Sequence, residues 1–494
     1  MTAARSNVPG AGDVSKAVIR IRPIHRAGAI ALACALLLAG CGPGPTVSPI
    51  AVPSGSASIG PLGQIDAGRI RADLAALEAI AADNGGVRTA GTAGYEASVQ
   101  YAAGRLRDLG YAVQTPEFEM ATFAEDPGGS ISIGGGGATF AAGADFHAKS
   151  YSASGEITAR VVAVGFDEGG SGGCAASDFA DFPSGAVALT PPGPCFRRDV
   201  VLNAVAAGAS ALVVAYPQWP KGAVRRPTLL SPDGMAIPAI SASAPVGDAL
   251  HDAADAGRRV TISVHTRIES AMVHNVIAES HAVAEHIVIL GGHLDGVPDG
   301  PGINDNGSGM AALLDVARVM ADEHPTVRVR FAFWGGEEFG LLGSRAYVEA
   351  LRSPERAEIA AYLNFDMIGS PNFVPIVYDA PSAAHGSKAI SDYLVAYLRK
   401  VGVGAEPTDI GASTDHAAFD AIGIPTGGIF SGASEIKTAE QARTFGGTAG
   451  EALDACYHLA CDTLANVDVD HVAVFAGAAL AVLVAIASGQ LSLD

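Results

Sequence analysis

The sequence predicts an α/β protein with a mostly parallel main sheet, and three features indicate this class. The continuous apolar run at 286–292 (HIVILGG) is typical of a parallel strand buried on both faces, and the run at 327–336 (VRVRFAFWGG) predicts the next strand. Each run is followed by a glycine turn and then a helical pattern, at 309–323 and 341–352. Between about 125 and 265, in contrast, Gly-rich turns separate short β-prone runs. We therefore expect a smaller strand-rich domain inserted into an α/β domain.

Apolar spacing and glycine turns also predict the remaining helices and strands along the chain. Residues 65–112 carry apolar side chains at helical spacing, with a Gly/Asn break around 84–94. Apolar runs at 359–369 and 423–432 continue the strand series after the insert. The closing stretch 471–489 is apolar enough to suggest a membrane span. Its many Ala and Gly residues and its length fit better a terminal helix that packs on the sheet.

Length and charge limit the classes of function. A chain of 494 residues is long enough for two or three domains with ample core. Its 31 basic and 51 acidic residues give a net charge of -20, which disfavours nucleic acid and anionic membrane surfaces as partners. The solvated acidic surface of an exported protein explains this charge equally well.

The N-terminus indicates export. Several Arg and Lys residues precede an apolar run that is too short to span a bilayer and ends at Cys41, as in a signal peptide. "LAGC" resembles a bacterial lipobox, so we expect residues 1–40 to be a lipoprotein signal peptide and Cys41 to be lipidated. The Gly/Pro/Ser-rich residues 41–64 would then be a flexible tether to the outer face of the cell membrane. An ordinary secretory signal is the alternative.

Four further cysteines, Cys174, Cys195, Cys456 and Cys461, remain in the mature chain. An even number of thiols in an exported protein favours two disulfides, most simply between the cysteines that are close in sequence.

Carboxylates and an imidazole recur where the predicted strands end. Because ligands bind at the carboxyl ends of strands in open α/β sheets, these side chains should meet in one crevice. Carboxylates brought together there repel each other unless cations neutralise them. Imidazole and carboxylate ligands without thiolates suit zinc in a hydrolytic site. The residues concerned are His293, Asp295, Asp305, Glu337, Glu338 and Asp366.

Five sequence blocks make the chain resemble the M28 family of di-zinc aminopeptidases, particularly its secreted actinobacterial branch. They are "GGHLDGV", "GINDNGSG", "WGGEEFGLLGS", "NFDMIGSPN" and "CYHLACDTLAN". The resemblance covers residues 65–120 and 270–490. It implies a three-layer sandwich around a mixed, mostly parallel sheet, which is the zinc exopeptidase fold.

The resemblance also implies roles for individual residues. His293 and Asp366 would bind one of two zinc ions, and Glu338 and His458 the other, with Asp305 bridging the pair. Glu337 would be the general base. Tyr457 would support the tetrahedral oxyanion, and Asp295 would accept a hydrogen bond that orients the imidazole of His293.

The same resemblance bears on two smaller segments. A Cys456–Cys461 disulfide would fix Tyr457 and His458 where the metal needs them. Some secreted relatives have an arginine just before an "SDH" segment, where this chain reads "GASTDHAAF" with Ser413 and Thr414. We assign no direct metal role to the Asp and His that follow at 415 and 416.

The insert resembles a protease-associated (PA) domain, in which Cys174 and Cys195 are well placed to pair. The expected division is therefore a catalytic domain at 65–124 and 266–494, and a PA domain at 125–265. Such domains are thought to gate or select substrates, although a packing module without a selective role would explain the insert as well.

The expected function is removal of N-terminal residues from peptides by a monomeric enzyme with two zinc ions, although cobalt or manganese would also suit the ligands. A carboxypeptidase is the main alternative. It would need basic residues to hold a substrate carboxylate, and Arg345 alone accompanies the motif loops. Glutaminyl cyclases share the fold but work with one zinc. A surface-binding lipoprotein without catalysis is the alternative from another class, although such receptors typically lose metal ligands.

Overall fold

The computed structural model describes residues 64–493 except 167–169, 322–326 and 382. The expected signal peptide, Cys41 and all but the last residue of the tether therefore lie outside the described residues. The described chain contains two eight-stranded sheets and a two-stranded ribbon, with helices on both faces of the main sheet. This is the α/β class that the sequence predicts.

The main sheet is mixed and mostly parallel, as predicted. Its four central strands, β14, β13, β15 and β18, run parallel, whereas β12 and β16 are antiparallel to their central neighbours. In spatial order the strands are β1 (Ala112–Gln114), β12 (Val276–Glu279), β14 (Arg328–Trp334), β13 (Ile287–His293), β15 (Ile359–Phe365), β18 (Thr426–Phe430), β16 (Ile376–Tyr378) and β17 (Glu406–Thr408). The carboxyl ends of the four central strands therefore meet at one edge.

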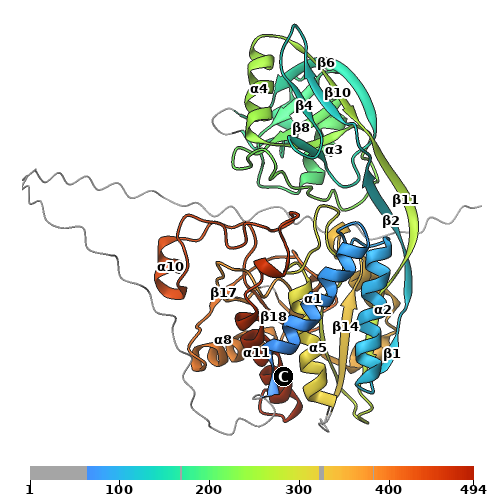
Figure 1. Ribbon diagram of the computed structural model, residues 1–494, viewed down its shortest axis with the longest axis vertical. Helices are drawn as coiled ribbons and strands as arrows, with labels where there is room; N and C mark the ends of the chain where they lie inside the picture. Colours follow the sequence, from blue (N-terminus) through green and yellow to red (C-terminus); the bar gives the residue numbers. More distant parts are fainter. Residues whose placement is uncertain (1–63, 167–169, 322–326, 382, 494) are drawn as a thin grey trace, which may run out of the picture. The chain divides into compact units, whose positions relative to one another are not determined.

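Helices on both faces of this sheet complete a three-layer sandwich (Figure 1). One face carries α1 (Ala67–Asp83), α2 (Ala93–Asp108), α5 (Gly307–Ala321), α8 (Ser387–Lys400) and α11 (Val469–Ala487). The other carries α6 (Leu342–Ala350), α7 (Ser353–Glu358) and α9 (His416–Asp420). A short helix, α10 (Ala439–Phe445), lies in the loop after β18.

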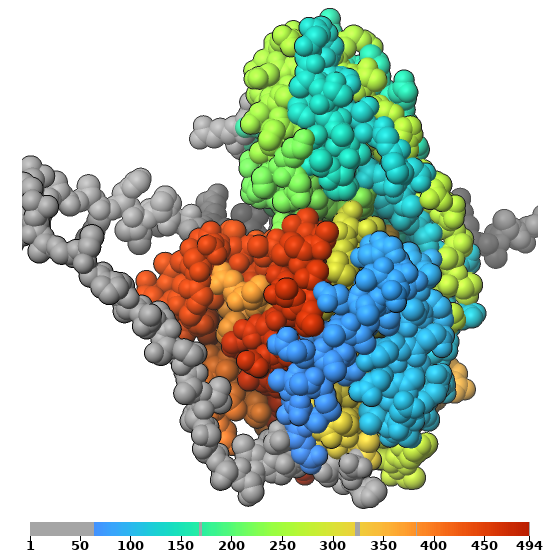
Figure 2. Space-filling model, in the orientation of Figure 1, coloured from blue at the N-terminus to red at the C-terminus, as the bar shows by residue number. Residues whose placement is uncertain are grey.

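Helix α11 is long and apolar enough to cross a membrane by length and composition, but it packs inside the protein. It contacts α1, α5 and α8, and side chains such as Val472, Phe475 and Leu480 are completely buried. The blue N-terminal segment and the red C-terminal segment lie side by side on the face shown in Figure 2. The packing fits the expected terminal core helix.

The insert is built on the second sheet, which also mixes parallel and antiparallel strands. In spatial order these are β4 (Thr139–Ala141), β3 (Ser130–Ile133), β10 (Arg259–Val264), β6 (Gly155–Ala163), β7 (Val187–Thr190), β8 (Ala211–Ala215), β9 (Ala239–Ala242) and β5 (Phe146–Ala148). It also contains α3 (Arg197–Ala206) and α4 (Ala244–Asp255). The antiparallel ribbon of β2 (Glu117–Glu125) and β11 (Thr266–His274) connects the two sheets along the chain.

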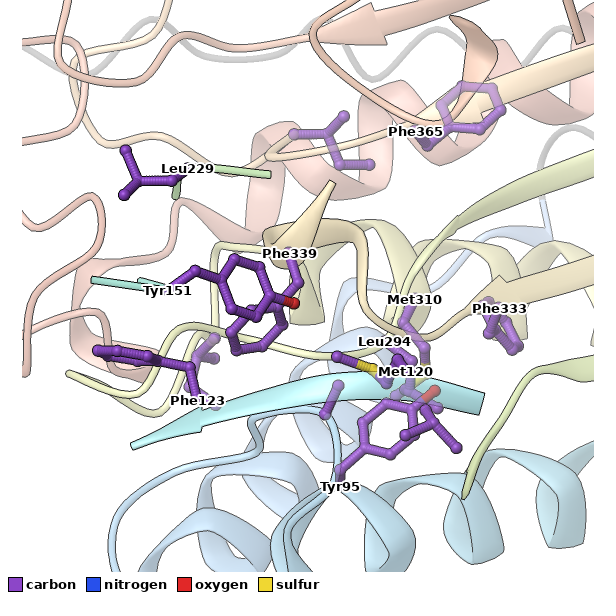
Figure 3. Close-up of a cluster of buried hydrophobic side chains, with 14 of the residues drawn as sticks. Tyr95, Met120, Phe123, Tyr151, Leu229, Leu294, Met310, Phe333, Phe339 and Phe365 are labelled. Atoms are coloured by element: carbon purple, nitrogen blue, oxygen red, sulfur yellow. The ribbon is translucent and has the colours of Figure 1, made fainter. Parts of the chain in front are cut away.

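A single hydrophobic cluster joins the ribbon, the insert and the main domain (Figure 3). The ring of Tyr151, in the insert, lies 5.7 Å from that of Phe339 and 6.4 Å from that of Phe123. Its hydroxyl donates to the main-chain oxygen of Ala121 at 2.7 Å. Phe339 ends the short 3-10 turn after β14 and is almost completely buried. The insert thus helps to anchor the turn that carries Glu337 and Glu338.

Candidate metal centre and active site

Five side chains from separate segments converge at the carboxyl edge of the main sheet. His293 is the last residue of β13, and Asp366 directly follows β15. Asp305 lies in the loop before α5, and Glu338 in the 3-10 turn Glu337–Phe339. His458 comes from the loop between Cys456 and Cys461. The structure therefore brings together all five residues that the sequence identified as candidate ligands.

Asp305 is the centre of this cluster. Its Oδ1 lies 3.2 Å from Nε2 of His293, and its Oδ2 lies 3.1 Å from Nε2 of His458. On the far sides, the same imidazole nitrogens lie 3.1 Å from Asp366 Oδ1 and from Glu338 Oε2. Two groups of three donors therefore share the Asp305 carboxylate, and a third group joins His293 to Glu337 and Glu338.

The donor set fits two divalent cations such as zinc. Each group offers one imidazole nitrogen and two carboxylate oxygens, without thiolates, which suits a catalytic site rather than a structural one. Oε1 of Glu338 is buried and lacks a hydrogen-bond partner among the described residues. Burial alone would raise the pKa of Asp305, but the two imidazoles hold it below its usual range. A cation held by Asp305, Glu338 and His458 would supply the partner that Oε1 of Glu338 lacks.

Asp295 orients the site through two different atoms. Its main-chain oxygen lies 2.9 Å from Nδ1 of His293, whereas its carboxylate is 3.8 Å away. The carboxylate instead accepts the N–H of Glu337 at 3.2 Å. Asp295 therefore accepts the hydrogen bond that was expected to orient His293, and the accepting atom is its main-chain oxygen. The fixed contact to Nδ1 leaves Nε2 directed at the cluster.

The loop that carries Asp305 is held by buried residues that the sequence analysis did not assign. The Asp462 carboxylate accepts the N–H of Asn304 at 2.8 Å and that of Asp305 at 3.0 Å. Arg88 is completely buried, and its guanidinium donates to the main-chain oxygens of Pro301, Gly302 and Leu294. Asp462 falls within the "CYHLACDTLAN" block. Arg88 lies about 200 residues from the loop, and nothing in the sequence around it indicates this contact.

Thr414 orients Asp366, one of the candidate ligands. Its hydroxyl donates to Asp366 Oδ2 at 2.7 Å and also lies 3.1 Å from the Asn364 amide. Asp415 is buried beside the cluster without ligating geometry, and burial raises its pKa to about 7. His416 lies against Tyr378, with 4.9 Å between ring centroids. Thr414, which stands where the "SDH" segment has its serine, therefore supplies a hydroxyl to a candidate ligand.

Glu337 belongs to the third donor group, but the two groups that share Asp305 are complete without it. Burial raises its pKa well above the usual value, and the neighbouring carboxylates of Glu338 and Asp366 add to this effect. The imidazole of His293 opposes it. A buried carboxylate with raised proton affinity is suited to accept a proton.

Tyr457 and His458 are fixed as a unit. Their rings stack with centroids 3.8 Å apart, and His458 has a positive φ of 59°. The disulfide Cys456–Cys461 closes the loop around them, and a second disulfide joins Cys174 to Cys195 in the insert. Burial raises the pKa of Tyr457 well above its usual value, so its phenol is protonated and remains a donor at neutral pH. From the insert, Arg225 donates its Nε–H to the main-chain oxygen of Tyr457 at 2.8 Å.

Comparisons with known proteins agree with this geometry. The family model "Peptidase family M28" matches residues 275–483, and the PA domain model matches residues 157–250. An aminopeptidase of Pseudomonas aeruginosa is 40% identical over 412 residues, which cover 80% of this chain and 76% of that protein. The chain belongs to peptidase family M28.

Other M28 relatives extend the comparison. A probable lipoprotein aminopeptidase of Mycobacterium tuberculosis, LpqL, is 40% identical over 413 residues, covering 80% of each chain. Among solved structures, an aminopeptidase from Aneurinibacillus sp. strain AM-1 superposes with a TM-score of 0.69 at 25% identity. The superposition covers 88% of this chain and 97% of the Aneurinibacillus protein. A Bacillus subtilis zinc aminopeptidase, at 24% identity and a TM-score of 0.63, shares the fold over 84% of this chain and 94% of its own.

A pocket of about 400 Å³ opens onto this M28 site, and the insert supplies much of its lining. Glu337, Glu338, Tyr457 and His458 line one part of it. Five arginines also line it, of which Arg345 comes from α6 and the others from the insert: Arg197, Arg198, Arg225 and Arg226. Arg345 is the arginine that accompanies the motif loops, and the pocket adds four arginines from outside those loops. The others lie far from the motifs along the chain, and folding of the insert brings them in.

Proposed function

We propose that this M28 aminopeptidase removes N-terminal residues from peptides with two zinc ions and with Glu337 as general base. The observation that carries the proposal is the position of Asp305, whose two carboxylate oxygens each face a different imidazole. A carboxylate in that position would be able to contribute one oxygen to each of two metal ions. His293 and Asp366 would hold one ion, and Glu338 and His458 the other.

When bound, a zinc pair polarises the substrate carbonyl and lowers the pKa of a shared water. The protein's own groups supply the rest of the chemistry. The Glu337 carboxylate takes the proton of the attacking water and delivers it to the leaving amine. Its main chain is held by Asp295 at 3.2 Å, which fixes the direction of approach. The protonated phenol of Tyr457 donates to the oxyanion of the tetrahedral intermediate.

The charge around one end of the site suits a free N-terminus. Asp366 and Asp415 lie close enough to Glu337 to raise its pKa, so a cationic group is favoured there. A substrate α-ammonium satisfies this requirement, whereas a blocked N-terminus does not. We therefore assign the end of the site near Asp366 to the N-terminal residue of the substrate.

The cellular setting is part of the proposal. We infer lipidation at Cys41 and attachment to the outer face of the cell membrane, supported by the "LAGC" block and by a mycobacterial relative described as a probable lipoprotein. The proposed domains are a catalytic part at 65–124 and 266–494 and a PA domain at 125–265. We propose a monomer. Replacing Cys41 with Ser should move the protein from the membrane fraction to the soluble fraction.

One assay separates the aminopeptidase from its main alternative. The arginines of the pocket are a specific observation in favour of a carboxypeptidase, which must hold a substrate carboxylate. Leucine p-nitroanilide and an N-acetylated dipeptide with a free carboxylate are compared on the full chain, with chelator and with zinc added back. The proposal expects zinc-dependent turnover of the anilide alone. Turnover of the N-acetylated dipeptide alone would replace it with the carboxypeptidase.

A further inference from the structure

The arginines that line the pocket differ in how many of their guanidinium nitrogens already have a partner. Arg226 is buried and bound by two carboxylates, with Nη1 2.6 Å from Glu125 Oε2 and Nη2 2.9 Å from Asp299 Oδ1. Arg198 is held by the main-chain oxygens of Leu229, Ser231 and Asp233. The guanidinium groups of these two side chains therefore stabilise the insert and its junction with the main domain.

Arg225 is held in place but keeps its charge unpaired. Its Nε–H donates to the main-chain oxygen of Tyr457, and its guanidinium carbon lies 5.6 Å from the ring of Trp219 and 5.7 Å from that of Tyr457. No carboxylate of the described residues forms an ion pair with it, and Nε is its only nitrogen with a hydrogen bond among them. A guanidinium that is oriented and half-buried, with free Nη donors, is prepared to bind a carboxylate.

The location of Arg225 gives the site an electrical polarity. Arg225 contacts Tyr457, the neighbour of His458, and so lies at the Glu338–His458 end of the donor cluster. The opposite end carries Asp366 with Glu337 and Asp415 around it. A short peptide has the same polarity, because its ammonium and its carboxylate are at opposite ends. The carboxylate would therefore face the insert when the ammonium faces Asp366.

We propose that Arg225 of the insert binds a carboxylate on the part of the peptide that follows the scissile bond, within its first two residues. The inference rests on the proposed aminopeptidase function and adds a preferred substrate class: peptides in which that carboxylate is a free C-terminus or an acidic side chain. The PA domain thus acts as a specificity-determining part of the site. Arg345 serves as a comparison, because it lines the same pocket but is exposed, where water weakens a charge pair.

Paired substrates test this on the full chain. Leu-Gly is compared with Leu-Gly-amide, and Leu-Glu-amide with Leu-Gln-amide, as ratios of kcat/KM within each protein. A hydrogen-bonded carboxylate predicts a ratio of about 10 to 100 in at least one pair. The first pair reports a C-terminal carboxylate and the second an acidic side chain, so the pair that responds identifies the source.

Three variants assign the preference to a residue. Arg225→Met should bring the ratio to about 1–2, Arg225→Lys should keep at least about a third of it, and Arg345→Met should change it by less than about threefold. The ratio is internal to each protein, so a general effect on the Tyr457 loop cancels. Ratios near 1 in the unaltered protein, or equal losses in Arg225→Met and Arg345→Met, would overturn the inference while the aminopeptidase remains. Failure to cleave leucine p-nitroanilide would overturn both.

Discussion

The carboxylate of Asp462 accepts the main-chain N–H of Asp305 at 3.0 Å. Its other oxygen accepts the neighbouring N–H of Asn304 at 2.8 Å, so one buried side chain holds the loop on which the shared carboxylate sits. The two imidazoles lie only 3.1–3.2 Å from Asp305. A small shift of this loop would therefore alter both donor groups at once.

Replacing Asp462 with Ala should destabilise the protein by about 2–6 kcal/mol, because two buried N–H groups would each lose their acceptor at about 1–3 kcal/mol. Asp462→Asn keeps one acceptor and should lose about half as much. Urea unfolding of metal-free protein measures the difference. Asp392→Ala, which removes the exposed pair with Lys388, is the matched control and should change little. An Asp462→Ala variant as stable as this control would contradict the role given to Asp462.

Replacing Thr414 with Val should weaken zinc binding about 10- to 100-fold, because the hydroxyl that orients the carboxylate of Asp366 is lost while the side-chain shape is kept. Competition with a chromophoric chelator measures the affinity. Thr444→Val removes an exposed hydroxyl that donates to Glu440 and should leave the affinity unchanged. Equal affinities in both variants would show that Asp366 needs no such support.

Replacing Glu337 with Gln should lower kcat by a factor of about 10² to 10⁴, the range associated with general acid–base catalysis. Elemental analysis should still find about two zinc ions per chain, because Glu337 is not needed to complete the two groups that share Asp305. Glu349→Gln, on the exposed side of α6, controls for the loss of one charge. If Glu337→Gln retained full turnover, the proton acceptor would have to be another group.

The stability of metal-free protein should fall as the pH rises from 5 to 8. Burial raises the pKa of Asp295 to about 7 and that of Asp462 to about 8, so the folded state holds protons that the unfolded carboxylates have released. The carboxylates around His458 outweigh its burial and raise its pKa to about 10, which acts in the same direction above pH 6.5. Zinc needs deprotonated ligands, so the Tm gained on adding zinc should grow with pH. Calorimetric scans at pH 5, 6, 7 and 8 measure both trends, and a Tm that rises with pH without metal would contradict this assignment.

The sequence was most informative where strand ends and chemical residue types coincide. His293, Glu338 and Asp366 each follow an apolar run whose end is visible in the sequence, and parallel packing then requires these ends to meet. Segments outside such runs were harder to predict. The strands β16 and β17 have three residues each, too few for a periodic pattern, and they were not expected.

Residues that act on the site from a distance along the chain were not predictable. Arg88 binds a loop more than 200 positions away, and Arg225 reaches Tyr457 across 232 positions. Their positions depend on tertiary packing rather than on any local pattern. For Asp295 the sequence predicted an acceptor for His293, and the structure shows that the accepting atom is its main-chain oxygen.

Zinc titration of the metal-free full chain, with leucine p-nitroanilide turnover followed at each addition, shows whether activity needs two metal ions. We expect binding of two zinc ions per chain and full activity only when both are bound, with one ion lost when His458 is replaced by Ala. A correctly folded protein that binds no zinc and stays inactive after reconstitution would contradict the two-metal site built on Asp305.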